Sequence, residues 1–286
     1  MRVLVRWLPP SWRPYVRRVA NALVPQRRHR EQQWHRIDAA FNGVPAVVQQ
    51  GPFAGMALGP LTTGSHYPKL LGTYEKELHS VINKLVENGY STIVDIGCGE
   101  GYYAIGLALT LRDALVFGFD INEEARRSCA KAAVANGVAA RVTLGGECSH
   151  QELNLLCEPS RKAFVLIDCE GCEVRILDPE VVPNLRTTDF LVETHDFLVE
   201  GVSEILTTRF SSTHDIEFIP VAHRSAEDAK LPVELTDADR QRVLDESRQS
   251  DQTWMSCLAR RADVSLKEFG ARPVWPARFG GGGDGT

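Results

Sequence analysis

The chain of 286 residues is 43% hydrophobic and 24% charged, with a net charge of −5. These values describe an ordinary globular protein of one large domain with additions, or of two small domains, and the acidic balance argues against binding of DNA. No apolar run reaches the about 18 residues that span a membrane, and Arg6 and Pro9 interrupt the apolar N-terminus, so we expect no signal peptide. The seven scattered cysteines are odd in number, which favours a cytoplasmic protein without a disulfide framework.

Residues 1–40 are predicted to form a basic N-terminal arm. The first 30 residues carry eight arginines and no acidic residue, and the aromatic residues Trp7 and Trp12 lie among them. Such a segment can bind a membrane surface or another anionic partner. The alternative is a solvated arm that packs loosely on the acidic remainder of the chain.

Residues 41–72 are rich in glycine and proline and show little periodicity, so we predict a loop-rich segment with short strands that caps the site. Beyond it, apolar residues follow a helical spacing from Tyr74 to Val86, and Gly89 is positioned to end that helix. Tyr74 and Glu75 are candidates to close over a bound ligand, and packing is the alternative for Tyr74.

Short apolar runs alternate with helical segments from residue 73 to residue 278. We expect strands at 91–96, 114–119, 141–144, 163–167, 189–193, 214–221 and 254–261. We expect helices at 102–111, 123–136, 149–157, 200–209 and, within an insertion near 225–250, at 236–248. This alternation predicts an α/β fold, doubly wound, with a seven-stranded, mostly parallel sheet that helices cover on both faces. Residues 279–286 are predicted to be a disordered tail.

A turn that contains three glycines follows the first strand of this region. The stretch reads IVDIGCGEGYY, and its glycines are Gly97, Gly99 and Gly101. A phosphate-binding P-loop requires a lysine after its last glycine, and this turn has none. A dinucleotide-binding turn requires glycine at the sixth position counted from Gly97, where this chain has Tyr102, so an NAD-dependent oxidoreductase is the weaker alternative.

The acidic residues around the turn favour a different nucleotide. Asp95 precedes the glycines, where a carboxylate suits a cationic ligand and would repel a pyrophosphate. S-adenosylmethionine carries an ammonium group and a positively charged sulfur, so it matches this environment. The glycines let the backbone approach such a ligand, and Asp120, at the end of the next strand, can accept hydrogen bonds from its ribose hydroxyls. We therefore predict S-adenosylmethionine as the cofactor.

Several stretches resemble class I S-adenosylmethionine-dependent methyltransferases. The first motif of that class is similar to VDIGCGEGYYAIGLA, and its second and third cofactor-binding positions are similar to Asp120 and the turn GGECS. At the matching positions, Ile121 and Glu147 are candidate cofactor contacts, and a solvated turn is the alternative for Glu147. The FkbM family within this class is similar to TYEKEL, VANG, LIDCEGCEVRIL and LVETHDF. The resemblance covers residues 73–200 and implies O-methylation of a hydroxyl group on a sugar or secondary metabolite.

Polar residues with catalytic potential follow the fourth and fifth expected strands. They are Asp168, Glu170, Glu193 and His195. Because ligands of doubly wound sheets bind outside the carboxyl ends of the strands, we expect these residues to face the methyl acceptor, and Asp168 to contact the cofactor as well. His195 is the best single base, since imidazole titrates near neutral pH, and one of the carboxylates can orient it. The alternative is a helix-capping Asp168 and a surface His195.

Other chemistries remain as alternatives to this assignment. Two carboxylates and a histidine can bind a divalent metal ion that orients a diol, but no compact ligand motif supports this, so no metal ligands are assigned. Cys169 and Cys172 form a C-x-x-C pair to which we give no role. The loop DCEG after the fourth strand lacks the Asn/Asp-Pro-Pro pattern of enzymes that methylate amide or base nitrogens. The remaining alternatives are an N-methyltransferase acting on protein or RNA and a non-catalytic cofactor-binding module.

Overall fold

The computed structural model describes residues 30–59, 65–246, 248 and 252–260. These residues form two compact units, a larger one of residues 46–224 and 245–260 and a smaller one of residues 30–45 and 225–244. Within the described ranges, no helix is both long enough and apolar enough to cross a membrane. The predicted arm up to residue 29 and the predicted tail lie outside the described residues.

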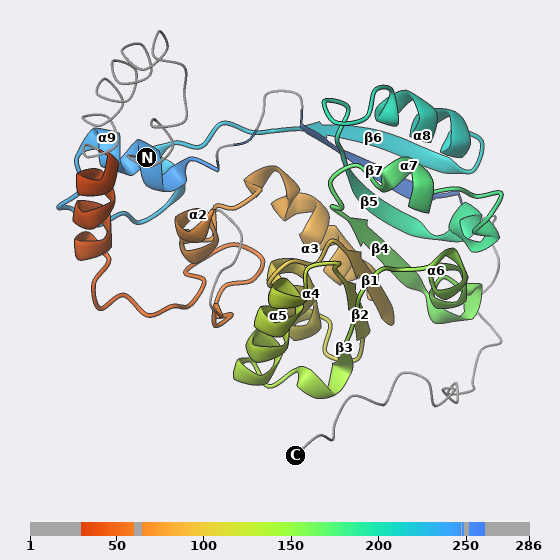
Figure 1. The fold of residues 1–286 in the computed structure, drawn as a ribbon, viewed down its shortest axis with the longest axis horizontal. Coiled ribbons are helices and arrows are strands. Elements are labelled where there is room, and N and C mark those ends of the chain that lie inside the picture. Colours follow the sequence, from red (N-terminus) through yellow and green to blue (C-terminus); the bar gives the residue numbers. More distant parts are fainter. Residues whose placement is uncertain (1–29, 60–64, 247, 249–251, 261–286) are drawn as a thin grey trace, which may run out of the picture. The chain divides into compact units, whose positions relative to one another are not determined.

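One sheet of seven strands forms the centre of the larger unit, as far as the described residues show (Figure 1). The strands are β1 (Thr92–Ile96), β2 (Leu115–Phe119), β3 (Val142–Gly145), β4 (Ala163–Ile167), β5 (Asp189–Thr194), β6 (His214–Pro220) and β7 (Thr253–Ala259). Their order across the sheet is β3-β2-β1-β4-β5-β7-β6. β7 runs antiparallel to β5 and β6, and the other neighbouring pairs are parallel. The predicted mostly parallel, doubly wound sheet is confirmed.

Helices connect the strands at the positions that the sequence predicts. They are α3 (His79–Asn88), α4 (Tyr102–Thr110), α5 (Glu123–Ala135), α6 (His150–Leu156) and α8 (Val202–Phe210), with short 3-10 turns η2 (Lys76–Leu78), η3 (Ala139–Arg141), η4 (Pro159–Arg161) and η5 (Pro183–Thr187). Gly89 ends α3 in the left-handed conformation, and the side chain of Asn122 caps α5 by accepting hydrogen bonds from two backbone N–H groups. The sequence did not predict α2 (His66–Leu71) or the four-residue α7 (Glu173–Ile176).

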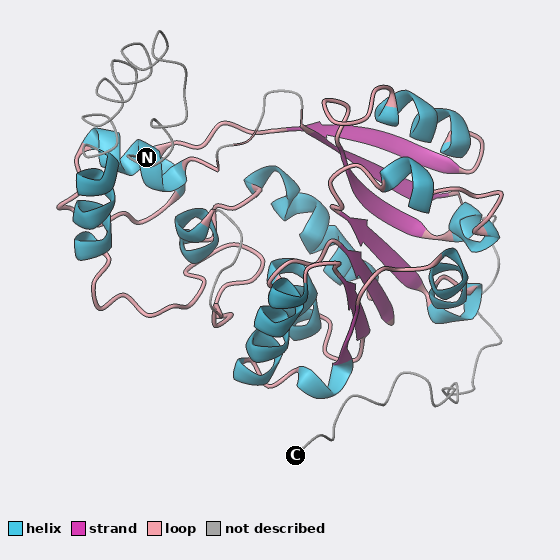
Figure 2. Ribbon diagram, in the orientation of Figure 1, coloured by secondary structure: helices cyan, strands magenta, loops and turns pink. Residues whose placement is uncertain are grey.

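Both faces of the sheet are covered by helices (Figure 2). Successive side chains of a strand point to opposite faces, so neighbouring residues of β1 and β2 enter different cores. Ile93 and Val116 pack on the side of α3, α4 and α5, whereas Val94 and Phe117 pack on the side of α6, α7 and α8. Because helices cover both faces of the sheet, every residue of β1 and β4 is buried, and the sequence of β4 is a continuous apolar run.

The described residues of the segment 41–72 contain one isolated antiparallel β-bridge, between Val47 and Ala57, and the unpredicted helix α2. The ring of Phe53 packs edge-on against Tyr102 and Tyr103 at centroid distances of 5.3 and 5.8 Å. Those tyrosines begin α4, so Phe53 of this segment packs on the helix that follows the glycine turn, within the larger unit.

The smaller unit joins two segments that the sequence-based prediction kept apart. A helix over residues 30–40 and the helix α9 (Asp237–Leu244) belong to it, together with η6 (Ala226–Asp228). Arg36 forms an ion pair with Asp239 at 3.0 Å, and the guanidinium of Arg242 lies 5.1 Å from the ring centre of Trp34. The end of the predicted arm and the predicted insertion therefore form one unit.

Two glycines of the turn are required by neighbouring protein atoms. Gly97 has a φ of +88°, and a Cβ atom there would lie 1.6 Å from the carbonyl oxygen of Asp168. A Cβ atom at Gly101 would lie 2.5 Å from the Sγ atom of Cys129. These glycines therefore allow the end of β1 to approach the end of β4, and the start of α4 to approach α5. From the sequence, we had explained them by approach to a ligand alone.

Replacement of Gly97 by alanine tests this close approach. Gly137 is a matched control, because it has a φ of +69° and no atom lies within 4 Å of the place that its Cβ would take, so that Gly137→Ala carries only backbone strain of about 1 kcal/mol. Gly97→Ala adds a collision with backbone, and we expect the free energy of unfolding to fall by more than about 3 kcal/mol. Urea denaturation measures both values, and equal losses would contradict the explanation.

Candidate functional site

The carboxyl ends of β1, β2, β4 and β5 meet at one edge of the sheet. From β1, the strands β2 and β3 extend the sheet to one side, and β4 and β5 extend it to the other. Ligands of open α/β sheets bind at the point where the strand order reverses in this way. A cavity of about 340 Å³ lies there, within the range of about 300–1,000 Å³ typical of ligand pockets. The predicted site residues that line this cavity are Asp95, Gly97, Gly99, Asp120, Asp168 and Glu170.

Asp95 provides a buried carboxyl group at this cavity. Its side chain is buried, and neither carboxylate oxygen accepts a well-formed hydrogen bond from the described residues. Burial, reinforced by the charge of Asp168, raises the pKa of Asp95 to about 8, although the N–H of Ala104 at the start of α4 acts in the opposite direction. A buried carboxyl group without partners is costly, so this position is typical of a site that binds a cation. The ammonium group of S-adenosylmethionine fits it.

Asp120 organises the glycine turn. Its Oδ2 atom accepts a hydrogen bond from the N–H of Gly99 at 2.8 Å, and its Oδ1 atom accepts one from the N–H of Asn122 at 2.7 Å. Each carboxylate oxygen has two acceptor sites, so the half-buried Asp120 can still accept hydrogen bonds from ribose hydroxyls. Lys69 of α2 forms a buried ion pair with Glu100 at 2.5 Å, which ties α2 to the turn and was not predicted.

Four predicted cofactor contacts do not line this cavity. They are Glu75, Gly101, Ile121 and Glu147. Ile121 is 84% exposed, and Glu147 forms an exposed ion pair with an arginine of α7. The carboxylate of the fully buried Glu75 accepts hydrogen bonds from the hydroxyl of Tyr103 and the guanidinium of Arg248. The structure thus places Glu75 in the packing around the site.

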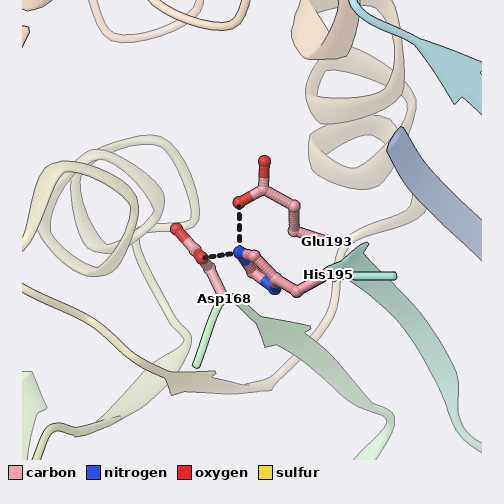
Figure 3. A group of neighbouring side chains, drawn as sticks. All are labelled: Asp168, Glu193 and His195. Atoms are coloured by element: carbon pink, nitrogen blue, oxygen red, sulfur yellow. Dashed lines mark ion pairs between the residues drawn. The ribbon is translucent and has the colours of Figure 1, made fainter. Parts of the chain in front are cut away.

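The polar residues that follow β4 and β5 converge as the sequence predicts (Figure 3). The Nε2 atom of His195 lies 3.7 Å from Asp168 Oδ1 and 3.5 Å from Glu193 Oε2. Glu170 Oε2 also lies 3.5 Å from this nitrogen. The alternative of a surface histidine is wrong, because His195 is completely buried. We call Asp168, Glu193 and His195 the rim cluster.

Glu173 orients His195, a role that we had expected of another carboxylate. The Nδ1 atom of His195 lies 2.5 Å from Glu173 Oε1, and that oxygen also accepts the N–H of Gly171 at 3.0 Å. Both side chains are fully buried, so the imidazole ring is held in one orientation. Glu173 lies in the stretch LIDCEGCEVRIL, so its place close after Asp168 was the signal that could have identified it.

The pKa values of the rim cluster are shifted by burial and by mutual charge. Burial alone would lower the pKa of His195, but the hydrogen bond to Glu173 and the charge of Asp168 raise it above the ordinary value. Burial and the charge of Glu193 raise the pKa of Asp168 well above its ordinary value. Burial raises the pKa of Glu193 to about 7, although Arg248 partly offsets it. The raised pKa keeps His195 protonated over more of the neutral pH range than an ordinary histidine, so less of it is present as the free base that the sequence predicted.

Arg248 compensates the acidic charge behind the rim cluster and was not predicted from the sequence. Its side chain is 11% exposed and forms ion pairs with Glu75, with Glu193 Oε1 at 2.5 Å and with Glu246 at 2.9 Å. This arrangement occupies one oxygen of Glu193 and leaves Oε2 on the side of His195. No sequence signal identifies Arg248, since it lies far along the chain from Glu75 and Glu193, in the region predicted as an insertion.

The loop between β4 and α7 is closed by a disulfide bond between Cys169 and Cys172. From the sequence, we expected no disulfide framework and gave this pair no role. The bond encloses Glu170 and lies between Asp168 and Glu173, so it constrains the loop that supplies the site. The other five cysteines are buried as free thiols.

Comparison with known families gives one match. Residues 54–160 match the family described as ribosomal protein L11 methyltransferase (PrmA). This part of the chain contains the glycine turn and Asp120, and it ends before β4 and the rim cluster. No curated protein matches the chain.

Several solved structures are similar to the chain. An O-methyltransferase from Bacillus cereus in complex with SAH has a TM-score of 0.46 at 14% identity, covering 65% of this chain and 80% of that one. A putative O-methyltransferase from Klebsiella pneumoniae has a TM-score of 0.44 at 14% identity, with the same two coverages of 65% and 80%. TomG from Streptomyces achromogenes, an O-methyltransferase in complex with SAM, has a TM-score of 0.41 at 15% identity, with coverages of 66% and 88%. These identities are too low to transfer a substrate to this chain.

Replacement of Arg248 by methionine tests its role in the site. The change leaves buried carboxylates without their cation, so we expect the free energy of unfolding to fall by about 3–5 kcal/mol. The control is Arg127→Met, which removes an ion pair to Glu123 whose side chains are 72% and 65% exposed and is expected to cost about 0–1 kcal/mol. Chemical denaturation measures both, and a loss of less than about 1 kcal/mol in Arg248→Met would contradict this role.

Proposed function

We propose that this protein, an S-adenosylmethionine-dependent methyltransferase with a Rossmann-like fold, methylates a hydroxyl oxygen of a sugar or another small metabolite. The observation that carries the proposal is the convergence of Asp168, Glu193 and His195 beside the cavity that also reaches the glycine turn. The resemblance of the surrounding stretches LIDCEGCEVRIL and LVETHDF to the FkbM family supports the same class of acceptor.

The cofactor is assigned to the part of the cavity formed by the glycine turn. Asp95 would bind its ammonium group, and Asp120 would accept hydrogen bonds from its ribose hydroxyls while holding Gly99 in place. When bound, S-adenosylmethionine supplies a methyl group that its positively charged sulfur activates toward nucleophiles. The main task of the protein is then to hold an acceptor oxygen in line with that methyl group.

The rim cluster is assigned to the acceptor. Asp168 lines the cavity and is only partly exposed, so its carboxylate can accept a hydrogen bond from an acceptor hydroxyl. A hydroxyl oxygen must lose its proton as it is methylated, and the carboxylate of Asp168, which lines the cavity, can take that proton with His195 Nε2 3.7 Å behind it. Glu173 holds His195 in the orientation that points Nε2 at the other two members.

A second candidate function is methylation of a protein, which the family match at residues 54–160 favours. That match covers the glycine turn and stops before Asp168, so it bears on the cofactor more directly than on the acceptor. The loop DCEG at the end of β4 also lacks the pattern associated with methylation of amide or base nitrogens. We therefore prefer a hydroxyl acceptor.

A methyl-transfer assay tests this preference. The protein is incubated with S-adenosylmethionine that carries an isotope-labelled methyl group, together with a panel of sugars, phenols and vicinal diols or with ribosomal proteins. We expect S-adenosylhomocysteine and a product in which NMR shows the label on oxygen. Label found on protein nitrogen alone would contradict the proposal and support the second candidate.

The same assay with His195→Ala separates the acceptor side from the cofactor side. Since His195 does not line the cavity, we expect the affinity for S-adenosylhomocysteine to be unchanged and the turnover to fall by about 100-fold or more. His223→Ala is the matched control, because His223 is exposed and lies outside the rim cluster. Unchanged turnover in His195→Ala would contradict a part for His195 in the reaction.

A further inference from the structure

We propose that the rim cluster binds a divalent metal ion, with Asp168, Glu193 and His195 as its protein ligands. The proposal rests on the proposed function in one respect, since the ion would hold the oxygen of the hydroxyl acceptor. The sequence alone assigns no metal ligands, because no compact motif joins the three residues. The structure provides the spatial arrangement that the sequence spacing does not.

The distances within the rim cluster suit a common metal ion. One ligand atom from each side chain lies within 4.8 Å of the other two, and the three side chains point toward one another from the ends of β4 and β5 (Figure 3). Ligand atoms about 2.1 Å from a metal ion are about 3.0–3.4 Å apart in octahedral or tetrahedral geometry. The distances from His195 Nε2 to Asp168 Oδ1 and Glu193 Oε2 are 3.7 and 3.5 Å, so only small movements are needed.

Buried polar atoms without partners point to the same place. His195 is completely buried, and its Nε2 atom makes no hydrogen bond to any of the described residues. The Oδ1 atom of Asp168 is likewise buried without a hydrogen bond from the described part of the chain. Buried polar atoms are nearly always satisfied in folded proteins, so unpaired atoms that face one another indicate a missing ligand. One cation would satisfy both.

Neighbouring side chains fix the orientation of two members of the rim cluster, as is usual for metal ligands. A metal-binding histidine typically donates its second N–H group to a carboxylate, which fixes the ring and leaves the other nitrogen free for the metal. In this protein Glu173 is that carboxylate, and its Oε1 atom pairs with the Nδ1 atom of His195. Arg248 binds one oxygen of Glu193 and leaves the other on the side of the cluster. Two of the three ligands are therefore already oriented.

The ligand set favours a first-row transition ion such as Mn²⁺. Two carboxylates and one imidazole combine the oxygen ligands that Mn²⁺ accepts with a nitrogen ligand that Mg²⁺ rarely takes. Three protein ligands leave coordination positions open, as catalytic metal sites do. Asp168 lines the cavity, so two oxygens of a vicinal diol could take open positions there, and the ion would lower the pKa of the bound hydroxyl.

Binding of Mn²⁺ to the full chain after dialysis against a chelator tests the proposal. Titration followed by electron paramagnetic resonance should show one Mn²⁺ per chain. Asp168→Asn, which preserves the shape of a partly exposed side chain, should weaken the affinity by more than about 100-fold. Glu217→Gln, at an exposed position on β6, should leave the affinity unchanged. An absence of binding, or equal affinity in Asp168→Asn and the original protein, would overturn the metal site.

A second variant and the methyl-transfer assay complete the test. Glu173→Gln should lower the affinity for Mn²⁺ by about 10-fold without abolishing binding, since it weakens the orientation of His195. Full O-methylation by metal-free protein would overturn the metal site and leave the proposed function intact. Binding of Mn²⁺ by a protein that methylates only nitrogen would support the metal site and contradict the proposed function.

Discussion

The contact between Gly97 and the backbone of Asp168 is the constraint on which the site depends. The N–H of Asp168 donates to the carbonyl of Ile96 at 2.8 Å, and the Asp168 carbonyl occupies the space where any side chain at position 97 would begin. This contact brings the turn after β1 and the loop after β4 together at the edge of the sheet. One cavity therefore borders both Asp95 and Asp168, which allows a cofactor and an acceptor to meet.

The loops that meet at this edge are acidic, so their buried carboxylates repel one another, and two contacts reduce this repulsion. Arg248 compensates the charges of Glu193 and its acidic neighbours from behind, and Glu173 pairs with His195 in the buried layer. Asp95 and the inner atoms of the rim cluster remain without such compensation. We assign the cationic cofactor and the metal ion to those uncompensated positions, because a cation there would offset the cost of burying an unpaired carboxylate.

The sequence predicts most of the fold because its signals are local. Apolar runs identify the strands, Gly89 and Asn122 mark helix boundaries, and the glycine turn after β1 identifies the cofactor side. The pairing of Arg248 with Glu193 depends on how distant segments meet, and no local pattern contains that information. The short helix α7 was not predicted because four residues are too few to show a helical periodicity. Its first residue is Glu173, so the orientation of His195 by Glu173 was not predicted either. The site was thus predictable strand by strand, but not in its supporting contacts.

Calorimetric titration with S-adenosylhomocysteine and, separately, with NAD tests most directly whether the glycine turn holds S-adenosylmethionine. Asp95 precedes the turn where a pyrophosphate would be repelled, and the sixth position of the turn is Tyr102. We expect saturable binding of S-adenosylhomocysteine with one site per chain and no binding of NAD. Tight binding of NAD without a response to S-adenosylhomocysteine would contradict the assignment of the cofactor and the reaction together.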